Sequence, residues 1–263
     1  MSKMQNKERI RYYHSYTDDF AQARDQNYTV PEDYKWVRED FFSRLLSVLI
    51  YSIAILFGIF YCSFGLHVKI KGRKKLKAMR KTGGFLYANH TQPIGDVLNP
   101  AFCAFPIRIY TVVSPANLSI PVIGRILPYL GALPTASTMS GMRRFTEAIE
   151  HRLSQKKCIV IYPEAHLWEY CAFIRTFPET SFRFPKAYKK PSYCMTTTYQ
   201  KRRFGKKPRI TIYVDGPFEA DSELSGKAAA VKLRDDIYNC MCERAENSTY
   251  HYIEYRKSEE HKD

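Results

Sequence analysis

The sequence predicts an α/β fold in which helices flank a mostly parallel sheet, with one long apolar helix ahead of the sheet. From residue 67 onward, short β-branched segments alternate with helical ones, which is typical of layered α/β domains. The 263 residues are 45% hydrophobic and 25% charged, as expected of a globular chain with one substantial core. Residues 45–66 are uncharged and apolar, and they divide the chain into three parts.

The first part, residues 1–44, is a polar N-terminal arm. It contains eight Lys and Arg residues and eight Asp and Glu residues, so its net charge is zero. It is rich in tyrosine and has neither the helical nor the strand period. We therefore expect a surface segment or an arm that lies on a membrane.

The second part, residues 45–66 (LLSVLIYSIAILFGIFYCSFGL), is predicted to be a membrane anchor, with a fully buried core helix as the alternative. As a helix, these 22 residues are about 33 Å long, enough to cross the hydrocarbon core of a bilayer. A cleaved signal peptide is not expected, because the run starts far from Met1 and no small-residue cleavage site follows it. Gly58 in the middle leaves two arrangements open, a spanning helix and a re-entrant one that dips into one leaflet.

A run of basic residues follows the anchor. Eight Lys and Arg residues and no acid stand between Lys69 and Lys81, and they supply much of the net charge of +15. Basic residues next to a span mark its cytoplasmic side and bind anionic headgroups. We expect a protein of the cell membrane with its main domain on the cytoplasmic side and an anionic membrane surface as partner. No signature of a nucleic-acid-binding fold accompanies the charge, so no nucleic acid is expected.

The third part, residues 67–263, is long enough for a single domain. Its strands are expected where apolar residues alternate with polar ones or form short β-branched runs between turn residues. These segments are 67–71, 85–88, 108–113, 158–162, 193–199 and 209–215. Amphipathic spacing predicts a helix over residues 139–155, capped by Thr138 or Ser137, and a second helix over about 227–246.

The seven cysteines are scattered and form no pattern with zinc spacing. Their odd number and apolar surroundings predict free thiols in a reducing compartment. No metal site is expected.

One turn carries a pattern with chemical meaning. The strand 85–88 is followed by Asn89 and His90, and a turn with proline and glycine then leads to Asp96. A histidine oriented by a carboxylate can take a proton from a hydroxyl group. No Ser or Cys stands in a nucleophile-elbow context, so the attacking hydroxyl is expected to belong to the substrate. The alternative is that these are ordinary turn residues and that His90 is a half-buried hydrogen-bonding side chain.

Four blocks in order support the chemical interpretation. They are the segment FLYANH at 85–90, the segments 121–124 and 127–134 (LPYLGALP), the segment YPEA at 162–165, and the stretch from 175 to 193. Together with the anchor and the basic strand, this order resembles the glycerolipid acyltransferases of the 1-acylglycerol-3-phosphate acyltransferase family. The resemblance covers residues 40 to 215.

The resemblance implies a membrane-anchored O-acyltransferase with the fold of that family. His90 is then the base that deprotonates a lysophospholipid hydroxyl, and Asp96 orients His90. The acyl donor is a thioester of coenzyme A or of acyl carrier protein, which is a co-substrate, so no cofactor is implied. On the family pattern the first acceptor to expect is 1-acylglycerol-3-phosphate, which gives phosphatidic acid.

Two departures from the family pattern concern the site. Five residues separate His90 from Asp96, where the family has four, and we expect the turn to bulge so that the carboxylate still reaches the ring. The family block E-G-T-R reads E-A-H-L here, with Leu167 in place of the arginine expected to hold the acceptor phosphate. Another cation is then expected to take over, first Arg175 and next Arg143 and Arg144.

Two other residues of the same region complete the expected substrate-binding set. Glu164 is carried over from the family block, and His166 is either a polar replacement within it or an ordinary loop histidine. For each of the three arginines the alternative is a solvated surface charge. The lost arginine also leaves open a lipid acceptor without a phosphate monoester, or an inactive membrane-binding scaffold. An active enzyme is expected to hold His90 and Asp96 in hydrogen-bond range beside a pocket for an acyl chain.

Overall fold

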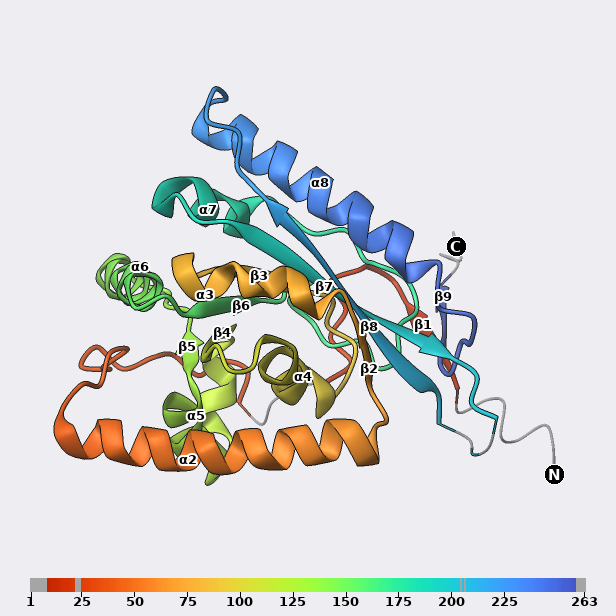
Figure 1. Ribbon diagram of the computed structural model, residues 1–263, viewed down its shortest axis with the longest axis horizontal. Coiled ribbons are helices and arrows are strands. Elements are labelled where there is room, and N and C mark those ends of the chain that lie inside the picture. Colours follow the sequence, from red (N-terminus) through yellow and green to blue (C-terminus); the bar gives the residue numbers. More distant parts are fainter. Residues whose placement is uncertain (1–8, 22–24, 204, 206, 259–263) are drawn as a thin grey trace, which may run out of the picture.

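The structure is a computed structural model that describes residues 9–21, 25–203, 205 and 207–258. A seven-stranded sheet runs through the middle of this part of the chain, with helices on both faces (Figure 1). Its order is β2-β8-β7-β3-β6-β4-β5, and all neighbours are parallel except β7 and β8. The predicted fold class is confirmed. The strands are β2 (Lys69–Lys71), β3 (Gly84–Ala88), β4 (Ile109–Val113), β5 (Ala132–Pro134), β6 (Cys158–Ile161), β7 (Ser192–Gln200) and β8 (Arg209–Phe218).

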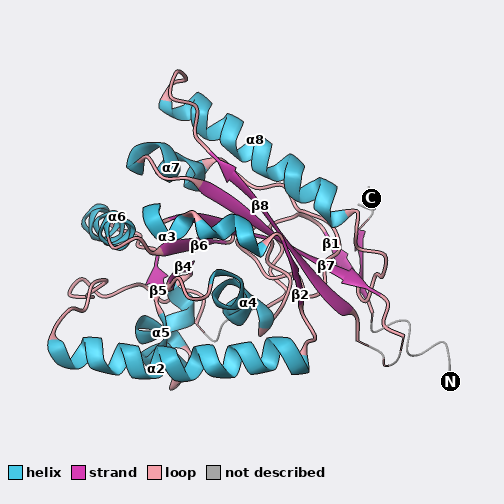
Figure 2. Ribbon diagram, viewed as in Figure 1, coloured by secondary structure: helices cyan, strands magenta, loops and turns pink. Residues whose placement is uncertain are grey.

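The helices, cyan in Figure 2, form layers around this sheet. One core cluster contains side chains of α6 and α8, and a second contains side chains of α3 and α4. The helices are α2 (Phe41–Phe60), α3 (Met79–Thr82), α4 (Gly95–Ala104), α5 (Ile123–Leu130), α6 (Met139–Ser154), α7 (Arg183–Tyr188) and α8 (Gly226–Ala245).

The central strand β3 shows why the sheet is covered on both faces. Its five residues are all buried, and Phe85 and Tyr87 point into one core cluster while Leu86 and Ala88 point into the other. Such an alternation is the two-residue period of a strand, here apolar on both faces because helices cover both. The strand therefore holds the turn that follows it between two packed layers.

The predicted elements of residues 67–263 lie where expected. Each of the six expected strands overlaps an observed one, and the helix expected over 139–155 runs from Met139 to Ser154. The hydroxyl of Thr138 accepts a hydrogen bond from the backbone N–H of Gly141, so Thr138 is the N-cap. The three-residue strand β5 was not predicted, because Ala132–Pro134 is too short to show a period.

The described part of the N-terminal arm is packed on the domain, which its sequence did not predict. Strand β1 (Ile10–Tyr13) pairs in parallel with β9 (Glu254–Lys257) near the other end of the chain. Trp36 is 7% exposed, belongs to a core cluster, and donates from Nε1 to the carbonyl of Pro134 at 2.8 Å. The arm is thus hydrogen-bonded to, and packed against, the same domain that follows the apolar helix.

The apolar segment forms α2 and a π-helical turn, Tyr61–Gly65. This stretch, Phe41–Gly65, is the one helix of the described residues that is long and apolar enough to cross a membrane. It lies along the lower edge of the molecule in Figure 1, against α4 and α5. The predicted helix is present, and its outward side is exposed.

Candidate active site

The candidate site lies at the carboxyl ends of two neighbouring strands. β3 and β6 are parallel, with Tyr87 opposite Ile161, so the segments that leave them emerge at the same edge of the sheet. His90 follows β3 by two residues and Glu164 follows β6 by three. Open α/β sheets commonly bind ligands at such an edge. The sheet thus brings together two segments that lie more than 70 residues apart in the chain.

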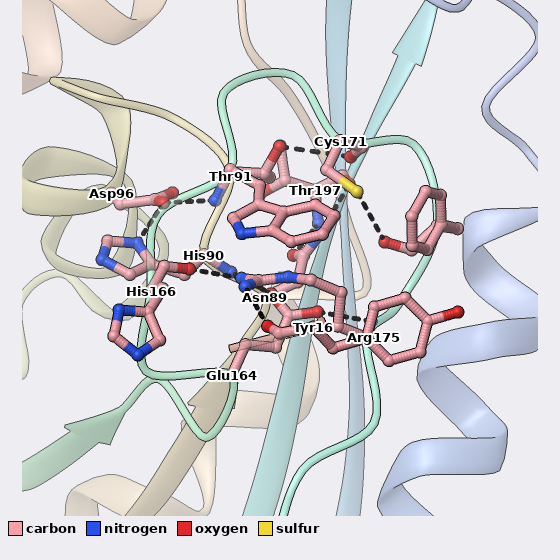
Figure 3. Close-up of polar contacts among 12 residues, drawn as sticks. Tyr16, Asn89, His90, Thr91, Asp96, Glu164, His166, Cys171, Arg175 and Thr197 are labelled. Carbon is pink, nitrogen blue, oxygen red and sulfur yellow. Dashed lines mark hydrogen bonds and ion pairs between the residues drawn. The ribbon is translucent and has the colours of Figure 1, made fainter. Parts of the chain in front are cut away.

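The predicted contact between His90 and Asp96 is confirmed. Nδ1 of His90 lies 2.8 Å from Oδ2 of Asp96 (Figure 3). The turn between them closes through a hydrogen bond from the backbone N–H of Asp96 to the carbonyl of Gln92, and α4 begins at Gly95. The five intervening residues therefore bulge as expected and bring Asp96, in the first turn of α4, back to the ring.

The same carboxylate oxygen is held by two backbone groups. The N–H groups of Thr91 and Gln92 donate to Oδ2 of Asp96 at 2.7 and 2.8 Å, and Asp96 is 3% exposed. An ionised carboxylate only accepts hydrogen bonds, so this arrangement assigns the ring proton of His90 to Nδ1. Nε2 then carries the lone pair that a base needs. The His90 side chain is 26% exposed, so the ring can be reached from outside.

Tyr162 supports this pair from the end of β6. Its ring lies against the ring of His90, with centroids 4.5 Å apart, and its hydroxyl donates to the backbone carbonyl of Asp96 at 2.5 Å. Burial raises the pKa of the Tyr162 phenol well above its ordinary value, so the hydroxyl stays a neutral donor. The sequence analysis gave Tyr162 no role. Its position directly after β6, beside the predicted Glu164, was the available signal.

Two further residues anchor the turn to β7. The side-chain amide of Asn89 accepts from the N–H of Thr197 at 2.8 Å and donates to its carbonyl at 3.1 Å, as a neighbouring strand would. The hydroxyl of Thr91 lies 2.9 Å from that of Tyr199. Asn89 was predicted only as part of the block FLYANH or as a turn residue, and no role was predicted for Thr91. They continue the sheet's hydrogen bonding past β3 and fix the position from which His90 projects.

Glu164 holds the backbone of this site. Its Oε2 accepts from the N–H of His90 at 2.9 Å and from Nη2 of Arg175 at 3.0 Å, and its Oε1 accepts from the N–H of Arg175 at 2.8 Å. Glu164 is 7% exposed. Its predicted role was substrate binding, whereas in the structure this carboxylate accepts hydrogen bonds from the protein's own donors. In the structure it holds the backbone of His90 in place.

Arg175 differs from its expected role. The sequence analysis placed it on the acceptor phosphate, but the residue is 0% exposed and its guanidinium lies over the ring of Trp168 at 4.7 Å. It donates to Glu164 and to the backbone carbonyls of His166 and Tyr16. Because its charge is already paired and its donors face protein groups, Arg175 is not presented to a substrate in this structure. It joins the segment after β6 to the N-terminal arm.

The other three expected substrate-binding residues have their interactions with other parts of the protein. Arg143, on α6, is exposed and forms an ion pair with Glu147 at 2.9 Å. The guanidinium of Arg144, on the same helix, lies over the ring of Trp36 at 5.5 Å. Nδ1 of His166 lies 3.7 Å from a carboxylate oxygen of Asp19. In the described part of the chain no hydrogen bond or ion pair joins any of the three to His90 or Asp96, and their roles toward a substrate stay predictions.

The N-terminal arm covers the segment after β6. Trp168 donates from Nε1 to the carbonyl of Asp18 at 2.8 Å, and Tyr13 and Phe20 pack against its ring. Arg11 forms an ion pair with Glu169 at 2.7 Å. These contacts were not predicted, since nothing in the arm's composition indicates which surface it covers. Through these contacts the arm packs against the segment that follows β6 beside the candidate site.

The described residues contain one group of side chains with the types and spacing that a metal ion needs. It consists of Cys194, Asp215 and Cys240, and it does not include the His90–Asp96 pair. Both oxygens of Asp215 accept hydrogen bonds from Arg244 at 2.7 and 2.8 Å, so this carboxylate is occupied by a cation already.

Two surface hollows also lie away from the pair. One is lined by residues of α8 and of the segment before it, and the other includes Lys69, Gln200 and Arg209. The expectation of an acyl-chain pocket beside His90 therefore stays a prediction.

Comparison with known proteins agrees with the fold. The chain is similar in structure to the 1-acyl-sn-glycerophosphate (LPA) acyltransferase PlsC of Thermotoga maritima, with a TM-score of 0.50 and 12% sequence identity. The match covers 76% of this chain and 95% of that one. No family model matches the sequence, and no curated protein is similar to it. At this identity the likeness shows a shared fold.

Proposed function

We propose that this protein is an O-acyltransferase that moves a fatty acyl group from a thioester to the hydroxyl of a lysophospholipid. The observation that carries the proposal is the 2.8 Å contact between His90 Nδ1 and Asp96 Oδ2 at the carboxyl end of the central strand. The shared fold with an acyltransferase of known structure supports the reaction class. The order of sequence blocks from residue 85 to 193 supports it independently.

The reaction follows from the assigned proton of His90. The acceptor hydroxyl donates to Nε2, which takes its proton as the oxygen attacks the thioester carbonyl. Asp96 stabilises the imidazolium that forms. The tetrahedral intermediate then collapses, its carbon–sulfur bond breaks, and His90 returns the proton to the departing thiolate. The products are an ester and a free thiol, and no acyl-enzyme forms.

The acceptor is the second element of the proposal. The structural neighbour acts on 1-acyl-sn-glycerophosphate, and we propose the same lipid as the first acceptor to test, with phosphatidic acid as product. A phosphate brought next to the reacting thioester needs a cation, because an unpaired buried charge is very costly. Since Arg175 is occupied by Glu164, the remaining expected cations are Arg143 and Arg144. A lipid acceptor without a phosphate monoester is the alternative.

The donor and the setting complete the proposal. A thioester of coenzyme A or of acyl carrier protein serves as co-substrate, and the reaction as written uses no further cofactor. The apolar helix α2 supports association with a membrane, where the lysolipid acceptor and its acylated product reside. We propose the cell membrane, with the α/β domain on the cytoplasmic side and the basic run after the anchor on anionic headgroups.

The test is an acyl-transfer assay of membranes that carry the protein, with a panel of lysolipids and both thioester donors. Mass spectrometry of the lipid products identifies the acceptor. The proposal expects a new diacyl lipid, formed fastest from 1-acylglycerol-3-phosphate. If products form only from acceptors without a phosphate monoester, the proposed acceptor is wrong and the proposed reaction stands. If no donor and acceptor pair gives an acylated product, the proposed enzyme activity is wrong and the scaffold alternative remains.

A further inference from the structure

Two cysteine side chains meet where α8 packs on β7 (Figure 1). The thiol of Cys194, on β7, donates a hydrogen bond to the sulfur of Cys240, on α8, and the two Sγ atoms are 3.8 Å apart. Cys194 is buried, Cys240 is half-buried, and both are free thiols. The residues lie 46 positions apart in the chain. The fold therefore brings two thiols into direct contact, a juxtaposition that their places in the sequence do not indicate.

The separation of the two sulfur atoms is one from which a disulfide can form. The sulfur atoms of a disulfide are about 2.05 Å apart, so the two Sγ atoms have to approach by about 2 Å. Rotation of the two side chains about their Cα–Cβ bonds, with a small shift of α8, can supply an approach of this size. The strand and the helix thus need no rearrangement to be linked.

The two thiols differ in reactivity, and Cys240 is the one that reacts first. The hydrogen bond from Cys194 stabilises the thiolate of Cys240, and Arg244, one turn further along α8, adds a positive charge, so the pKa of Cys240 lies below its ordinary value of 9.0. The same hydrogen bond and burial raise the pKa of Cys194 well above that value, so Cys194 keeps its proton. The pair thus consists of a half-buried nucleophile and a buried partner thiol.

The carboxylate beside the two thiols is Asp215, which lies opposite Cys194 on β8. Its Oδ1 accepts from Nζ of Lys75 at 2.6 Å and from Nη2 of Arg244 at 2.8 Å, and its Oδ2 accepts from Nε of Arg244 at 2.7 Å. A metal ion on this carboxylate has to displace two cations that are already there. The chemistry that the two thiols can carry out without displacing anything is their own oxidation.

We propose that Cys194 and Cys240 are a redox-active pair, which a hydroperoxide converts to a disulfide that links β7 to α8. With hydrogen peroxide, the thiolate of Cys240 attacks one oxygen and the O–O bond breaks. The other oxygen leaves as hydroxide, takes up the proton that Cys240 had released, and becomes water, while Cys240 becomes a sulfenic acid.

The second step forms the disulfide. The sulfur of Cys194 attacks the sulfenic sulfur of Cys240, the S–O bond breaks, and the departing hydroxide takes the proton of Cys194 and becomes a second water. In sum, two thiols are oxidised by two electrons, and one peroxide is reduced to two waters. A small thiol reverses the bond by thiol–disulfide exchange, which suits the reducing compartment expected for this chain, where disulfides are mostly transient.

The pair is separate from the candidate active site but joined to it by β7. Thr197, three residues after Cys194 on β7, exchanges hydrogen bonds with Asn89, which directly precedes His90. Neither cysteine takes part in the proposed acyl transfer. The redox pair therefore goes beyond the proposed function, and it is tested by measurements that need no turnover.

Cys242 is the matched control for Cys240. It lies two residues further along α8, and it is a half-buried free thiol as well. Its partner is the hydroxyl of Tyr238 rather than a second thiol, and burial raises the pKa of Cys242 above the ordinary value. In the folded protein, iodoacetamide should therefore alkylate Cys240 at least about 10-fold faster than Cys242. Equal rates would overturn the assignment of Cys240 as the thiol that reacts first.

The deciding experiment maps disulfides in the full-length protein. The protein is reduced, freed of reductant in detergent, and treated with hydrogen peroxide. The remaining thiols are alkylated in denaturant, and the peptides are identified by mass spectrometry without reduction. We expect a Cys194 peptide joined to a Cys240 peptide with the loss of two hydrogens, and separated again by dithiothreitol. If both cysteines are recovered as alkylated thiols, or if Cys240 is a sulfinic acid while Cys194 is still a thiol, the proposed pair is wrong.

Single substitutions test the role of each cysteine. In Cys194→Ser the sulfenic acid on Cys240 meets no partner thiol, so dimedone should label Cys240 strongly in this variant and weakly in the wild type. Cys242→Ser should form the disulfide between Cys194 and Cys240 as fast as the wild type does. A disulfide from Cys194 to Cys242 in the wild type, or equal dimedone labelling of Cys240 with and without Cys194, would overturn the proposed pair.

Discussion

The guanidinium of Arg175 and the carboxylate of Glu164 form a buried ion pair, with Nη2 and Oε2 3.0 Å apart and side chains 1% and 2% exposed. Glu164 also accepts the backbone N–H of His90, so the pair connects the N-terminal arm, through Tyr16, to the residue proposed as the base. The cation that the sequence assigned to the substrate is thus part of the scaffold that positions His90.

The first prediction follows from this pair. Arg175→Ala leaves Glu164 buried without its cation, and we expect the free energy of unfolding to fall by about 3–5 kcal/mol. Arg143→Ala removes an exposed ion pair and should change the free energy of unfolding by less than about 1 kcal/mol. Denaturant unfolding of both variants in the same detergent measures the difference. If Arg175→Ala keeps its stability and instead raises the Michaelis constant for a phosphate-bearing lysolipid, the phosphate role expected from the sequence is right.

The second prediction concerns Tyr162. Tyr162→Phe keeps the ring against His90 and removes the hydrogen bond to the Asp96 carbonyl, so kcat should fall about 10-fold, the value of one net hydrogen bond. Tyr188→Phe is the matched control, since it removes a similar hydrogen bond to the carbonyl of Thr146 on α6. It should leave kcat unchanged. Equal kcat values for Tyr162→Phe and the wild type would remove Tyr162 from the positioning of the pair.

The third prediction concerns stability in acid. Arg244 and then Lys75 donate to Asp215 and hold the pKa of its carboxyl below the ordinary value of 3.8. A lowered folded-state pKa stabilises the fold above the ordinary value, and this contribution is lost as the pH falls through the lowered pKa. Asp215→Asn should therefore cost about 1.5–3 kcal/mol at pH 7 and at pH 5.

Below pH 3.8 the difference between this variant and the wild type should shrink, because the wild-type carboxyl also becomes neutral. Unfolding curves at pH 7, 5 and 3 test this expectation. A difference that stays constant down to pH 3, or that is absent at pH 7, would show that the ion pairs of Asp215 do not stabilise the fold.

Sequence patterns predicted the local features of this fold well. The strands of residues 67–263 were recognisable because short runs of apolar residues fill segments buried on both faces, as in β3 and β6. The contact of His90 with Asp96 was predictable because proline and glycine in the turn allow the chain to bulge. These features depend on residues that are close together in the chain.

Features that depend on distant residues were not predictable. β1 pairs with a strand more than 240 residues away, and four residues do not indicate which edge they join. The burial of Arg175 results from Trp168, Glu164 and the arm meeting in space, which no spacing in the sequence reveals. The hydrogen bonds that join Ser47 and Tyr51 of α2 to the domain were not predictable either, because these residues in an apolar run suit either a lipid or a protein surface.

If His90 is the base for acyl transfer, its removal slows the release of free coenzyme A from an acyl thioester. The rate is measured with saturating lysolipid, and background release without the lysolipid is subtracted. We expect His90→Ala to be slower than the wild type by about 10²- to 10⁴-fold, the contribution of a positioned general base. His67→Ala, which replaces an exposed histidine ahead of β2, should keep the wild-type rate. Lysolipid-dependent release by His90→Ala within a few-fold of the wild type would show that His90 is not the base.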